Sequence, residues 1–539
     1  MPRATRHAAH DAIVVGAGHN GLVAACYLAR AGLRVLVLER RPVVGGACVT
    51  EEVFPGFKVS TAAYVSSLFR KEIVRDLRLR EYGFEVLARN PSSFTPLPDG
   101  RSLTLGPDAE QTRCEITRFS ARDAARYPGY EAMLERVAHF IEPTLAMTPP
   151  DLLRPGLRGL RDLWGLGRAF GRLGDDASEA VELLTGPARA ILDRWFESPV
   201  LKATLATDAI IGAMASPSTP GTGYVLFHHV MGETDGRRGV WGYVRGGMGG
   251  LTQALARAAG DLGVEIRCEA EVARILVREG RVAGVALAGG DEFRAPVVAS
   301  NADAHVTFLR LLAAEALPPA FRAAVERISY ESASVKINVA LSELPDFTAC
   351  PGRTPGPQHR GTIHICPDPD YIERAFDDAK YGRVSASPVL ECTIPSVVDD
   401  TVAPPGRHLM SMFVQYAPYA LRDATWEETR EAFADRCFAL LDEYAPNFSR
   451  SVLARQVLAP PDLERVFNLT GGNIFQGAMT PGQLFSLRPL PGWASYRTPV
   501  RGLYLCGAAA HPGGGVMGTP GHNAAREILR ERRRFRLTT

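Results

Sequence analysis

Residues 13–39 read IVVGAGHNGLVAACYLARAGLRVLVLE, and this stretch decides the fold of the chain. The three apolar residues at its start predict a short buried strand, a helix is expected over 22–31, and Gly32 ends that helix. Residues 35–38 predict a second buried strand, which ends at Glu39. A strand, a glycine-rich turn, a helix and a strand that closes on an acid are the parts of a nucleotide-binding βαβ unit.

The turn itself has the spacing GxGxxG, and each glycine has a physical purpose. Gly16 permits the tight turn, Gly18 lets the backbone approach a pyrophosphate, and Gly21 lets the helix pack close to the sheet. The N-terminus of the helix then offers free N–H groups to the phosphates. Glu39 is placed to accept hydrogen bonds from a ribose diol, and its charge argues against the 2′-phosphate of NADP. We expect a dinucleotide site; the alternative is an ordinary βαβ unit with a glycine-rich turn.

Two further glycine-rich segments separate FAD from NAD. Gly45 and Gly46 follow shortly after the acid, and such a doublet resembles the second signature of FAD proteins of the glutathione-reductase type. Residues 502–507 predict a strand that enters another glycine-rich turn, and a helix follows over 521–530. In FAD folds this strand and helix complete the cofactor domain. We therefore expect FAD to be held by Gly16, Gly18, His19, Asn20, Gly21, Glu39, Arg40, Gly45, Gly46, Arg245, Gly246, Gly247, Met248, Val272, Asn301, Gly507, Ala508, Gly515, Val516 and Met517.

Length, charge and cysteine pattern exclude several classes of function. The chain has 539 residues, which predicts two or three lobes, and a net charge of +2, which gives no electrostatic basis for binding nucleic acid. Its nine cysteines are scattered singly, so we expect neither a dithiol shuttle nor a metal site. No apolar stretch approaches ~20 residues, and the first ten residues lack the apolar core of a secretory signal. We expect a cytoplasmic location in a bacterium, or the mitochondrial matrix in a eukaryote.

The predicted class is α/β, with a discontinuous FAD-binding Rossmann-like domain and a mixed α+β substrate lobe. The cofactor domain is expected to resume at a second glycine-rich segment, 241–250, which leads into a helix and alternating strands. Strand patterns at 335–341, 389–394 and 408–415, with a helical pattern over 425–444, predict a mixed sheet that forms one wall of a pocket. The boundaries assign 1–70, 241–310 and 495–539 to the FAD domain and 71–240 and 311–494 to the lobe.

Residues 152–173 form a leucine- and arginine-rich segment. Its arginines lie mostly away from the larger apolar residues, which is a basic amphipathic pattern. We favour a cap helix packed on the lobe. The alternative is a surface that contacts a membrane or admits a lipidic substrate. The apolar residues near one helical face are Leu153, Leu157, Leu160, Trp164 and Phe170.

The whole chain resembles one family, the phytoene-desaturase-like FAD oxidoreductases, which include carotenoid desaturases, isomerases and flavin-type ketolases. The resemblance implies FAD, oxidoreductase chemistry and an apolar substrate. Many such flavoproteins have Asp directly after the glycine of the C-terminal turn, whereas this chain has Ala508. It also lacks a second strand–GxGxxG–helix unit for NAD(P)H. Besides the first glycine-rich turn, the resemblance lies in Trp195–Ser198, Leu201–Asp208, Tyr243–Gly250, Gly471–Phe475, Gln483–Phe485 and His511–Gly518.

His511 and Lys336 are the candidate catalytic residues. His511 precedes a proline and a run of glycines, on a loop expected beside the flavin, where an imidazole can act as a base or orient a substrate. Alternatively, the glycine N–H groups contact the flavin and His511 only caps the turn. Lys336 interrupts an apolar strand. In amine-oxidase-like flavoproteins a lysine near flavin N5 holds a water, and Lys336 is a candidate by that analogy, although we favour a surface-facing strand lysine.

Four other polar residues have two interpretations each. His228 and His229 are adjacent; on a strand they would point to opposite faces, so they line a pocket or bind nothing, and they make no metal site. Asn473 and Gln476 either hydrogen-bond a substrate or the flavin edge, or belong to a turn that the asparagine stabilises.

These residues predict an FAD-dependent oxidoreductase that desaturates or otherwise oxidises a hydrophobic organic substrate, with hydride transfer to flavin N5 and oxygen or a quinone as acceptor. One alternative is a carotenoid-type ketolase or monooxygenase that needs an external reductant. Another is a catalytically silent, FAD-bound regulatory or interaction protein. An amine oxidase also fits the fold, and an aromatic cage beside the flavin would distinguish it. The expected partners are a small hydrophobic molecule, a membrane surface and a second copy of the chain.

Overall fold

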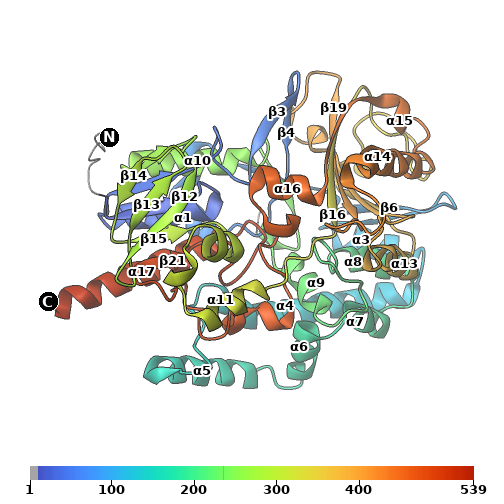
Figure 1. Ribbon diagram of the computed structural model, residues 1–539. Helices are drawn as coiled ribbons and strands as arrows, with labels where there is room; N and C mark the ends of the chain where they lie inside the picture. Colours follow the sequence, from blue (N-terminus) through green and yellow to red (C-terminus); the bar gives the residue numbers. More distant parts are fainter. Residues whose placement is uncertain (1–9, 235, 539) are drawn as a thin grey trace.

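Two sheets organise the protein, one for each expected part (Figure 1). The computed structural model describes residues 10–234 and 236–538, with the backbone alone described over 534–538. The expectation about an N-terminal signal falls on residues 1–9, which lie outside the described residues. The α/β class is confirmed.

The first sheet is parallel and has the order β11-β2-β1-β15-β21. Strands β1 (Ala12–Val15) and β2 (Val35–Leu38) flank helix α1 (His19–Arg30), as the sequence predicts. Every residue of these two strands is buried because helices cover the parallel sheet. The other strands come from distant parts of the chain, which makes this sheet discontinuous: β11 (Glu265–Arg267), β15 (Val298–Ser300) and β21 (Leu503–Leu505).

Helices α10 and α17 complete this region. Both pack near α1, and α17 follows the C-terminal turn. A three-stranded antiparallel sheet, β12-β13-β14, lies beside it. The bounds are α10 Gly249–Asp261, α17 Thr519–Thr538, β12 Val272–Arg278, β13 Arg281–Leu287 and β14 Glu292–Arg294.

The second sheet has seven strands in the order β20-β16-β19-β18-β17-β6-β7. It is mixed, because β17 and β6 are parallel and the other pairs are antiparallel. The strands predicted at 335–341, 389–394 and 408–415 are present as β16, β18 and β19, and helix α14 (Trp426–Asp442) covers 425–444. The bounds are β6 Ser93–Pro96, β7 Ser102–Leu105, β16 Ser334–Leu341, β17 Thr362–Ile365, β18 Val389–Thr393, β19 His408–Gln415 and β20 Val452–Leu458.

Two-stranded ribbons and short helices link the two sheets. The ribbons pair β3 (Thr50–Phe54) with β4 (Phe57–Ser60), β5 (Val86–Ala88) with β10 (Gly242–Val244), and β8 (Glu233–Thr234) with β9 (Arg237–Arg238). The connecting helices are α2 Lys71–Asp76, α11 Pro319–Glu326, α12 Pro357–Arg360, α13 Pro369–Lys380, α15 Phe448–Ser451 and α16 Pro460–Phe467.

A group of helices lies against the second sheet and carries residues that the sequence misplaces. Helix α9 (Thr222–Val230) contains His228 and His229, so the expectation of a strand there is wrong. The apolar run around these histidines fits a buried helix as well as a strand, and periodicity cannot separate the two. The other helices are α3 Ala109–Thr117, α4 Ala121–Leu145, α6 Asp176–Thr185, α7 Ala188–Trp195 and α8 Pro199–Thr207.

Helix α5 (Gly156–Gly171) lies along the lower edge of the molecule in Figure 1. The favoured expectation of a cap helix packed on the lobe holds for Phe170, whose ring packs edge-on against Phe140 of α4, but it is wrong for the rest of the apolar face. Leu153 is 71% exposed, Leu157 91% and Trp164 64%. Among the described residues, no helix is both long and apolar enough to span a bilayer.

Candidate functional site

The glycine-rich turn after β1 is shaped by close backbone contacts. Gly16 has φ +91°, a conformation that favours glycine. A Cβ on Gly21 would lie 2.2 Å from the carbonyl oxygen of Gly16, and one on Gly18 would lie 2.7 Å from Nδ2 of Asn301. Larger residues therefore cannot occupy this turn without moving the backbone. The first residues of α1 are open for a ligand: Nε2 of His19 and Oδ1 of Asn20 are buried without hydrogen-bond partners.

Glu39 lies at the end of β2, where the dinucleotide interpretation needs an acid. Its Oε2 accepts a hydrogen bond from the N–H of Ala17 at 2.8 Å, and its Oε1 accepts one from the N–H of Arg41 at 3.0 Å. The carboxylate is therefore fixed against the turn. Arg40 donates instead to the carbonyl oxygens of Arg465 and Val466, which turns its guanidinium to a different element.

Of the remaining expected cofactor residues, Gly45 and Gly46 lie beside the same turn. The N–H of Gly45 donates to the carbonyl of Ala17 at 2.9 Å, and Gly46 has φ +58°. In the next segment Gly246 and Gly247 both have positive φ. Arg245 differs from its neighbours, because its guanidinium is half exposed and pairs with Glu85. Of the others, Met248 is buried and its N–H donates to Oγ of Ser60, and Val272 begins β12 and is buried.

The C-terminal turn packs directly on the first one. A Cβ on Gly507 would lie 2.4 Å from the carbonyl oxygen of Asn301. Gly515 has φ +113°, and Val516 has φ +58°, which a β-branched residue rarely adopts. The carbonyl of Ala508 accepts two hydrogen bonds from the buried guanidinium of Arg488, at 2.8 and 3.0 Å. Met517 is buried, and its carbonyl accepts from the N–H of Arg70.

A cavity of about 740 Å³ begins at this turn and extends to the seven-stranded sheet. The residues from the turn are Ala508 and 514–516, and His19 and Cys48 lie at the same end. Most of the wall is apolar, with residues from helices α4, α8 and α9. The mixed sheet therefore forms one wall of a pocket, as the sequence predicts.

Three polar side chains and one phenylalanine cross the sheet wall in one row, because strand register aligns them. The row runs through four adjacent strands: Lys336 on β16, Phe413 on β19, Glu391 on β18 and His364 on β17. All four line the cavity.

Lys336 is 2% exposed, so the favoured expectation of a surface-facing lysine is wrong. Its ammonium donates to Oδ1 of Asn338 and to Oγ of Ser411, and it lies 5.2 Å from the centre of the Tyr64 ring. Burial lowers the pKa of Lys336 to about 7. Both faces of β16 are covered, which the sequence of one strand does not reveal.

Two carboxyl groups and an arginine face the same space. Burial raises the pKa of Asp208 to about 7, and burial also raises the pKa of Glu391, whose Oε1 accepts a hydrogen bond from the hydroxyl of Tyr64 at 2.5 Å. Arg89 is 4% exposed and donates through Nη1 to Oγ1 of Thr362 at 2.5 Å. Burial lowers the pKa of His364 to about 3, so this imidazole is neutral.

His511 lies near the cavity but does not line it. Its Nε2 hydrogen-bonds the carbonyl oxygen of Thr144 on α4 at 2.9 Å, and its ring packs edge-on against Phe485. Burial lowers the pKa of His511 to about 4. The glycines that follow His511 line the cavity instead, which agrees with the interpretation in which this histidine holds the loop.

Of the other polar candidates, Asn473 has structural partners, whereas the remaining three lie at the cavity or beneath the C-terminal turn. Oδ1 of Asn473 accepts from the N–H groups of Phe475 and Gly477, and its Nδ2 donates to the carbonyl of Glu331, so it stabilises a turn. Gln476 and His229 line the cavity. His228 lies beneath the C-terminal turn, where a Cβ on Gly515 would be 2.8 Å from its Nε2.

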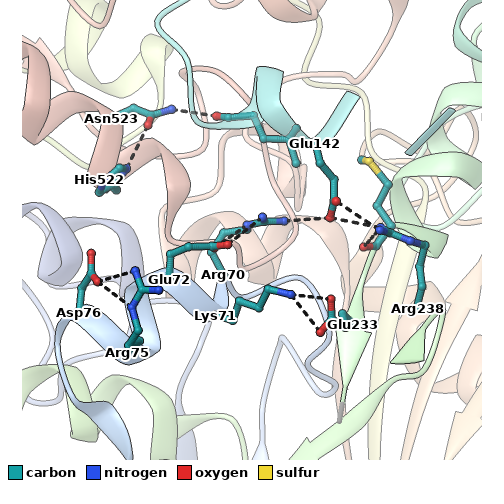
Figure 2. A network of polar contacts seen from close by, with 12 residues as sticks. Arg70, Lys71, Glu72, Arg75, Asp76, Glu142, Glu233, Arg238, His522 and Asn523 are labelled. Carbon is teal, nitrogen blue, oxygen red and sulfur yellow. Dashed lines mark hydrogen bonds and ion pairs between the residues drawn. The ribbon is translucent and has the colours of Figure 1, made fainter. Parts of the chain in front are cut away.

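An ion-pair network lies beside the cavity (Figure 2). Glu142 of α4 pairs with Arg70 and with Arg238, and Arg238 also donates to Glu135. Arg238 and Glu135 line the cavity. The network therefore ties the β8–β9 ribbon to α4 at the cavity wall.

Sequence reasoning assigned no role to Arg89, Asp208, Glu391 or Tyr64. The contacts that bring Arg89 to Thr362 and Tyr64 to Glu391 span hundreds of residues. One local signal was available, because Glu391 interrupts an apolar strand in the same way as Lys336.

Known proteins that resemble this chain identify its family. The sequence matches the family described as "Flavin containing amine oxidoreductase" over residues 21–529. The rat protein "Pyridine nucleotide-disulfide oxidoreductase domain-containing protein 2" is 49% identical over 97% of this chain and 94% of its own length. One of the subunits of the limonene dehydrogenase of Castellaniella defragrans is 28% identical, over 97% and 94%. A lycopene-forming phytoene desaturase of Pseudescherichia vulneris is 26% identical, over 94% and 96%, in keeping with the resemblance found in the motifs.

Solved structures support the same fold. Putrescine oxidase bound to putrescine superposes with a TM-score of 0.59 at 16% identity, covering 97% of this chain and 99% of that one. The cradle of turn glycines, the fixed acid at the end of β2 and the unpartnered polar atoms of α1 fit FAD. The chain belongs to the flavin-containing amine oxidoreductase family and is an FAD-dependent oxidoreductase.

Proposed function

We propose that this protein dehydrogenates a hydrophobic organic substrate in the 740 Å³ cavity, with oxygen or a quinone as the final electron acceptor. The observation that carries the proposal is the position of the cavity, which joins the C-terminal turn to a mostly apolar wall. Bound FAD would supply the two-electron acceptor. The names of two relatives, one from a limonene dehydrogenase and one a phytoene desaturase, are consistent with an apolar substrate.

The residues of this chain would position the substrate and exclude water. The apolar wall would hold the body of the substrate, and the backbone of 514–516 would hold the flavin edge. Lys336, with its lowered pKa, would accept or release a proton near neutral pH through its amine. His511 would keep the loop in place through the carbonyl of Thr144.

Two features argue against amine oxidation, which the family description suggests, and against disulfide chemistry, which the name of the rat relative suggests. Lys336 lies over the Tyr64 ring and so occupies an aromatic face that an amine substrate would use. The nine cysteines are scattered singly along the sequence with no CxxC or CxxxxC pair, which is the spacing that a redox-active dithiol needs.

Anaerobic reduction of the purified FAD-loaded protein tests the proposal. Terpenes, polyenes, other apolar donors and amines are mixed with it, and loss of the flavin absorbance is followed. We expect an apolar donor to bleach the flavin and NADH or NADPH not to do so. Rapid bleaching by NAD(P)H would favour the ketolase or monooxygenase, bleaching by amines alone an amine oxidase, and no bleaching by any organic donor a silent FAD-bound protein.

A pair of variants on one helix shows whether the donor uses the cavity. Ala132 of α4 lines the cavity mouth, whereas Ala125 of the same helix is exposed and lies outside the lining. Ala132→Trp should slow bleaching at least tenfold, and Ala125→Trp should leave it unchanged. Equal rates in both variants would place the reaction elsewhere.

A further inference from the structure

Arg89 is the most unusual charge in the cavity. It lies after β5, lines the cavity, and is almost completely buried. Its Nη1 donates to the hydroxyl of Thr362, and its Nε is buried without a hydrogen-bond partner. Among the described residues, no carboxylate forms an ion pair with it. A buried guanidinium stays charged and needs compensation, so an unpaired one in a cavity indicates a ligand with an opposite charge.

The neighbours of Arg89 do not supply that charge. Glu391 accepts its short hydrogen bond from Tyr64 rather than from Arg89, and burial disfavours its ionised form. Asp208 is likewise a weaker acid than usual. The ring of Tyr243 covers one side of the guanidinium, with a distance of 5.6 Å to the ring centre. Arg89 is therefore held by the hydroxyl of Thr362 and the ring of Tyr243, and among the described residues no carboxylate lies within ion-pair distance of it.

We propose that Arg89 binds a carboxylate of the substrate, so that the substrate is an amphipathic organic acid with an apolar body toward the flavin turn. This inference rests on the proposed function for the identity of the reaction. A guanidinium binds a carboxylate through two parallel hydrogen bonds. Thr362 and Tyr243 orient the guanidinium, and the apolar walls of α4, α8 and α9 contact the body of the acid.

Binding measured without turnover tests this assignment. The FAD-loaded protein is titrated with decanoate, decylamine and decanol, which share one chain and differ in charge, and binding is followed by calorimetry and by the flavin spectrum. We expect decanoate to bind at least tenfold tighter than the other two. Equal affinities, or a preference for the amine, would overturn the proposal. If no donor bleaches the flavin, the preference for decanoate can still be measured. The proposed function and the proposed role of Arg89 can therefore be refuted independently.

Variants assign the preference to one side chain. Arg89→Met should weaken decanoate binding at least tenfold and leave decanol unchanged, and Arg89→Lys should fall between. Arg113, which pairs with Glu110 at the exposed mouth, offers a matched control: Arg113→Met should bind decanoate like the parent. Loss of the preference in Lys336→Met but not in Arg89→Met would overturn the assignment. If Arg89→Met does not fold, the titrations of the wild-type protein with the three ligands and those of Arg89→Lys still test the assignment.

A second inference rests on a different observation, the exposed face of α5. The side chains of Leu152, Leu153, Leu157, Leu160 and Trp164 are each more than half exposed. Leu152 and Leu153 lie just before α5, and the other three lie on it. Such a group of large apolar side chains on one surface segment marks an interaction site. Five arginines and only one acid, Asp162, accompany them between 152 and 173.

The excess of arginines in this segment favours a negatively charged partner. We infer that α5 lies on an anionic lipid surface, with its leucines and Trp164 in the headgroup boundary and its arginines on the phosphates. Basic amphipathic helices with leucine and tryptophan on the apolar face bind membranes in this way. The guanidinium of Arg168 lies 4.8 Å from the ring centre of Trp164, and Arg161 is 76% exposed, so both kinds of contact are available together. A second copy of the chain would bring like charges together at this face.

Vesicle sedimentation tests this surface. The FAD-loaded protein is mixed with vesicles of phosphatidylcholine, with and without phosphatidylglycerol. We expect binding to the anionic vesicles, at least tenfold weaker at high salt, and a blue shift of tryptophan fluorescence. Leu153→Ser/Leu157→Ser/Trp164→Ser should reduce binding at least tenfold while the flavin content stays constant.

Three outcomes would overturn the membrane assignment. One is the absence of binding to anionic vesicles, and another is equal binding by the triple variant. The third is a dimer in solution that the triple variant converts to a monomer, because the covering partner would then be a second copy.

Discussion

The cofactor region and the substrate lobe are built by opposite means. Around the turn after β1, the decisive feature is the absence of side chains, because added Cβ atoms at Gly18, Gly21 and Gly507 would lie within 2.7 Å of their neighbours. Across the seven-stranded sheet, the decisive feature is the presence of buried polar side chains such as Lys336 and Glu391. The first region therefore leaves backbone groups open to a ligand, and the second presents side chains to the cavity.

The largest expected effect tests the close backbone contacts of the cofactor region. Gly21→Val should abolish FAD retention, because its Cβ would lie 2.2 Å from the carbonyl oxygen of Gly16. The ratio of flavin to protein absorbance after purification measures this. Gly260→Ala is the control, since that exposed glycine at the end of α10 has open space around it. Normal flavin content in Gly21→Val would refute the close-approach argument.

A buried arginine that joins the two regions should have the next largest effect. Arg488 donates to the carbonyls of Phe475, in the lobe, and Ala508, in the C-terminal turn, and is 1% exposed. Arg488→Met should lower the free energy of unfolding by about 3–5 kcal/mol, because it leaves buried carbonyls unpaired. Chemical denaturation measures the change. Arg353→Met, at an exposed ion pair, should change it by less than about 1 kcal/mol; similar losses in both variants would contradict the prediction.

A smaller effect tests how much the acid at the end of β2 contributes to FAD affinity. Glu39→Gln keeps the shape of the side chain but removes its charge, so its hydrogen bonds from Ala17 and Arg41 and its expected bonds to a ribose weaken. We expect FAD affinity to fall by about 2 kcal/mol, roughly thirtyfold. Reconstitution of the apoprotein with FAD gives the dissociation constant. An unchanged constant would mean that Glu39 only orders the turn.

The smallest effect concerns the pH dependence of stability in the lobe. The pKa of Asp208 is raised from 3.8 to about 7, so the folded state binds the extra proton and this group makes stability fall as pH rises through that window. The pKa of Lys336 is lowered from 10.5 to about 7, so the unfolded state binds the extra proton and stability rises from pH 7 to 10.5. Each slope is at most about 1.4 kcal/mol per pH unit.

Variants separate these two contributions. Asp208→Asn should remove the acidic slope and Lys336→Met the alkaline one, as measured by denaturation across pH. Persistence of either slope in its own variant would assign the titration to another group.

The same contrast explains what the sequence predicts well. Strands β1 and β2, helix α1 and the two glycine-rich turns depend on neighbours within about thirty residues, and their pattern appears in one stretch of sequence. The strands of the lobe also follow from local alternation. The assignment of cofactor residues stays a prediction, and so do the domain boundaries.

What the sequence does not predict depends on distant contacts. Lys336 is buried because β19 and β20 flank its strand and its side chain lies in the wall of the cavity. Arg89 hydrogen-bonds Thr362, which is 273 residues away in the sequence. The amphipathic pattern of α5 identifies an apolar face but not its partner, which is why the expectation of a packed helix is wrong for most of that face. His511 lies on the expected loop, yet a carbonyl of α4 takes its ring nitrogen.

The parallel sheet also has a consequence for synthesis of the chain. Its first strands emerge from the ribosome with the first forty residues, but β21 pairs with β15, and α17 reaches α1, only after residue 500. A built Cβ on Gly521 would lie 2.0 Å from the carbonyl oxygen of Asn20, so the two ends of the sequence meet at the N-terminus of α1. A chain shortened by a late stop codon therefore has an open sheet edge and no closed cofactor cradle. We therefore expect flavin to be retained only by chains that extend through β21.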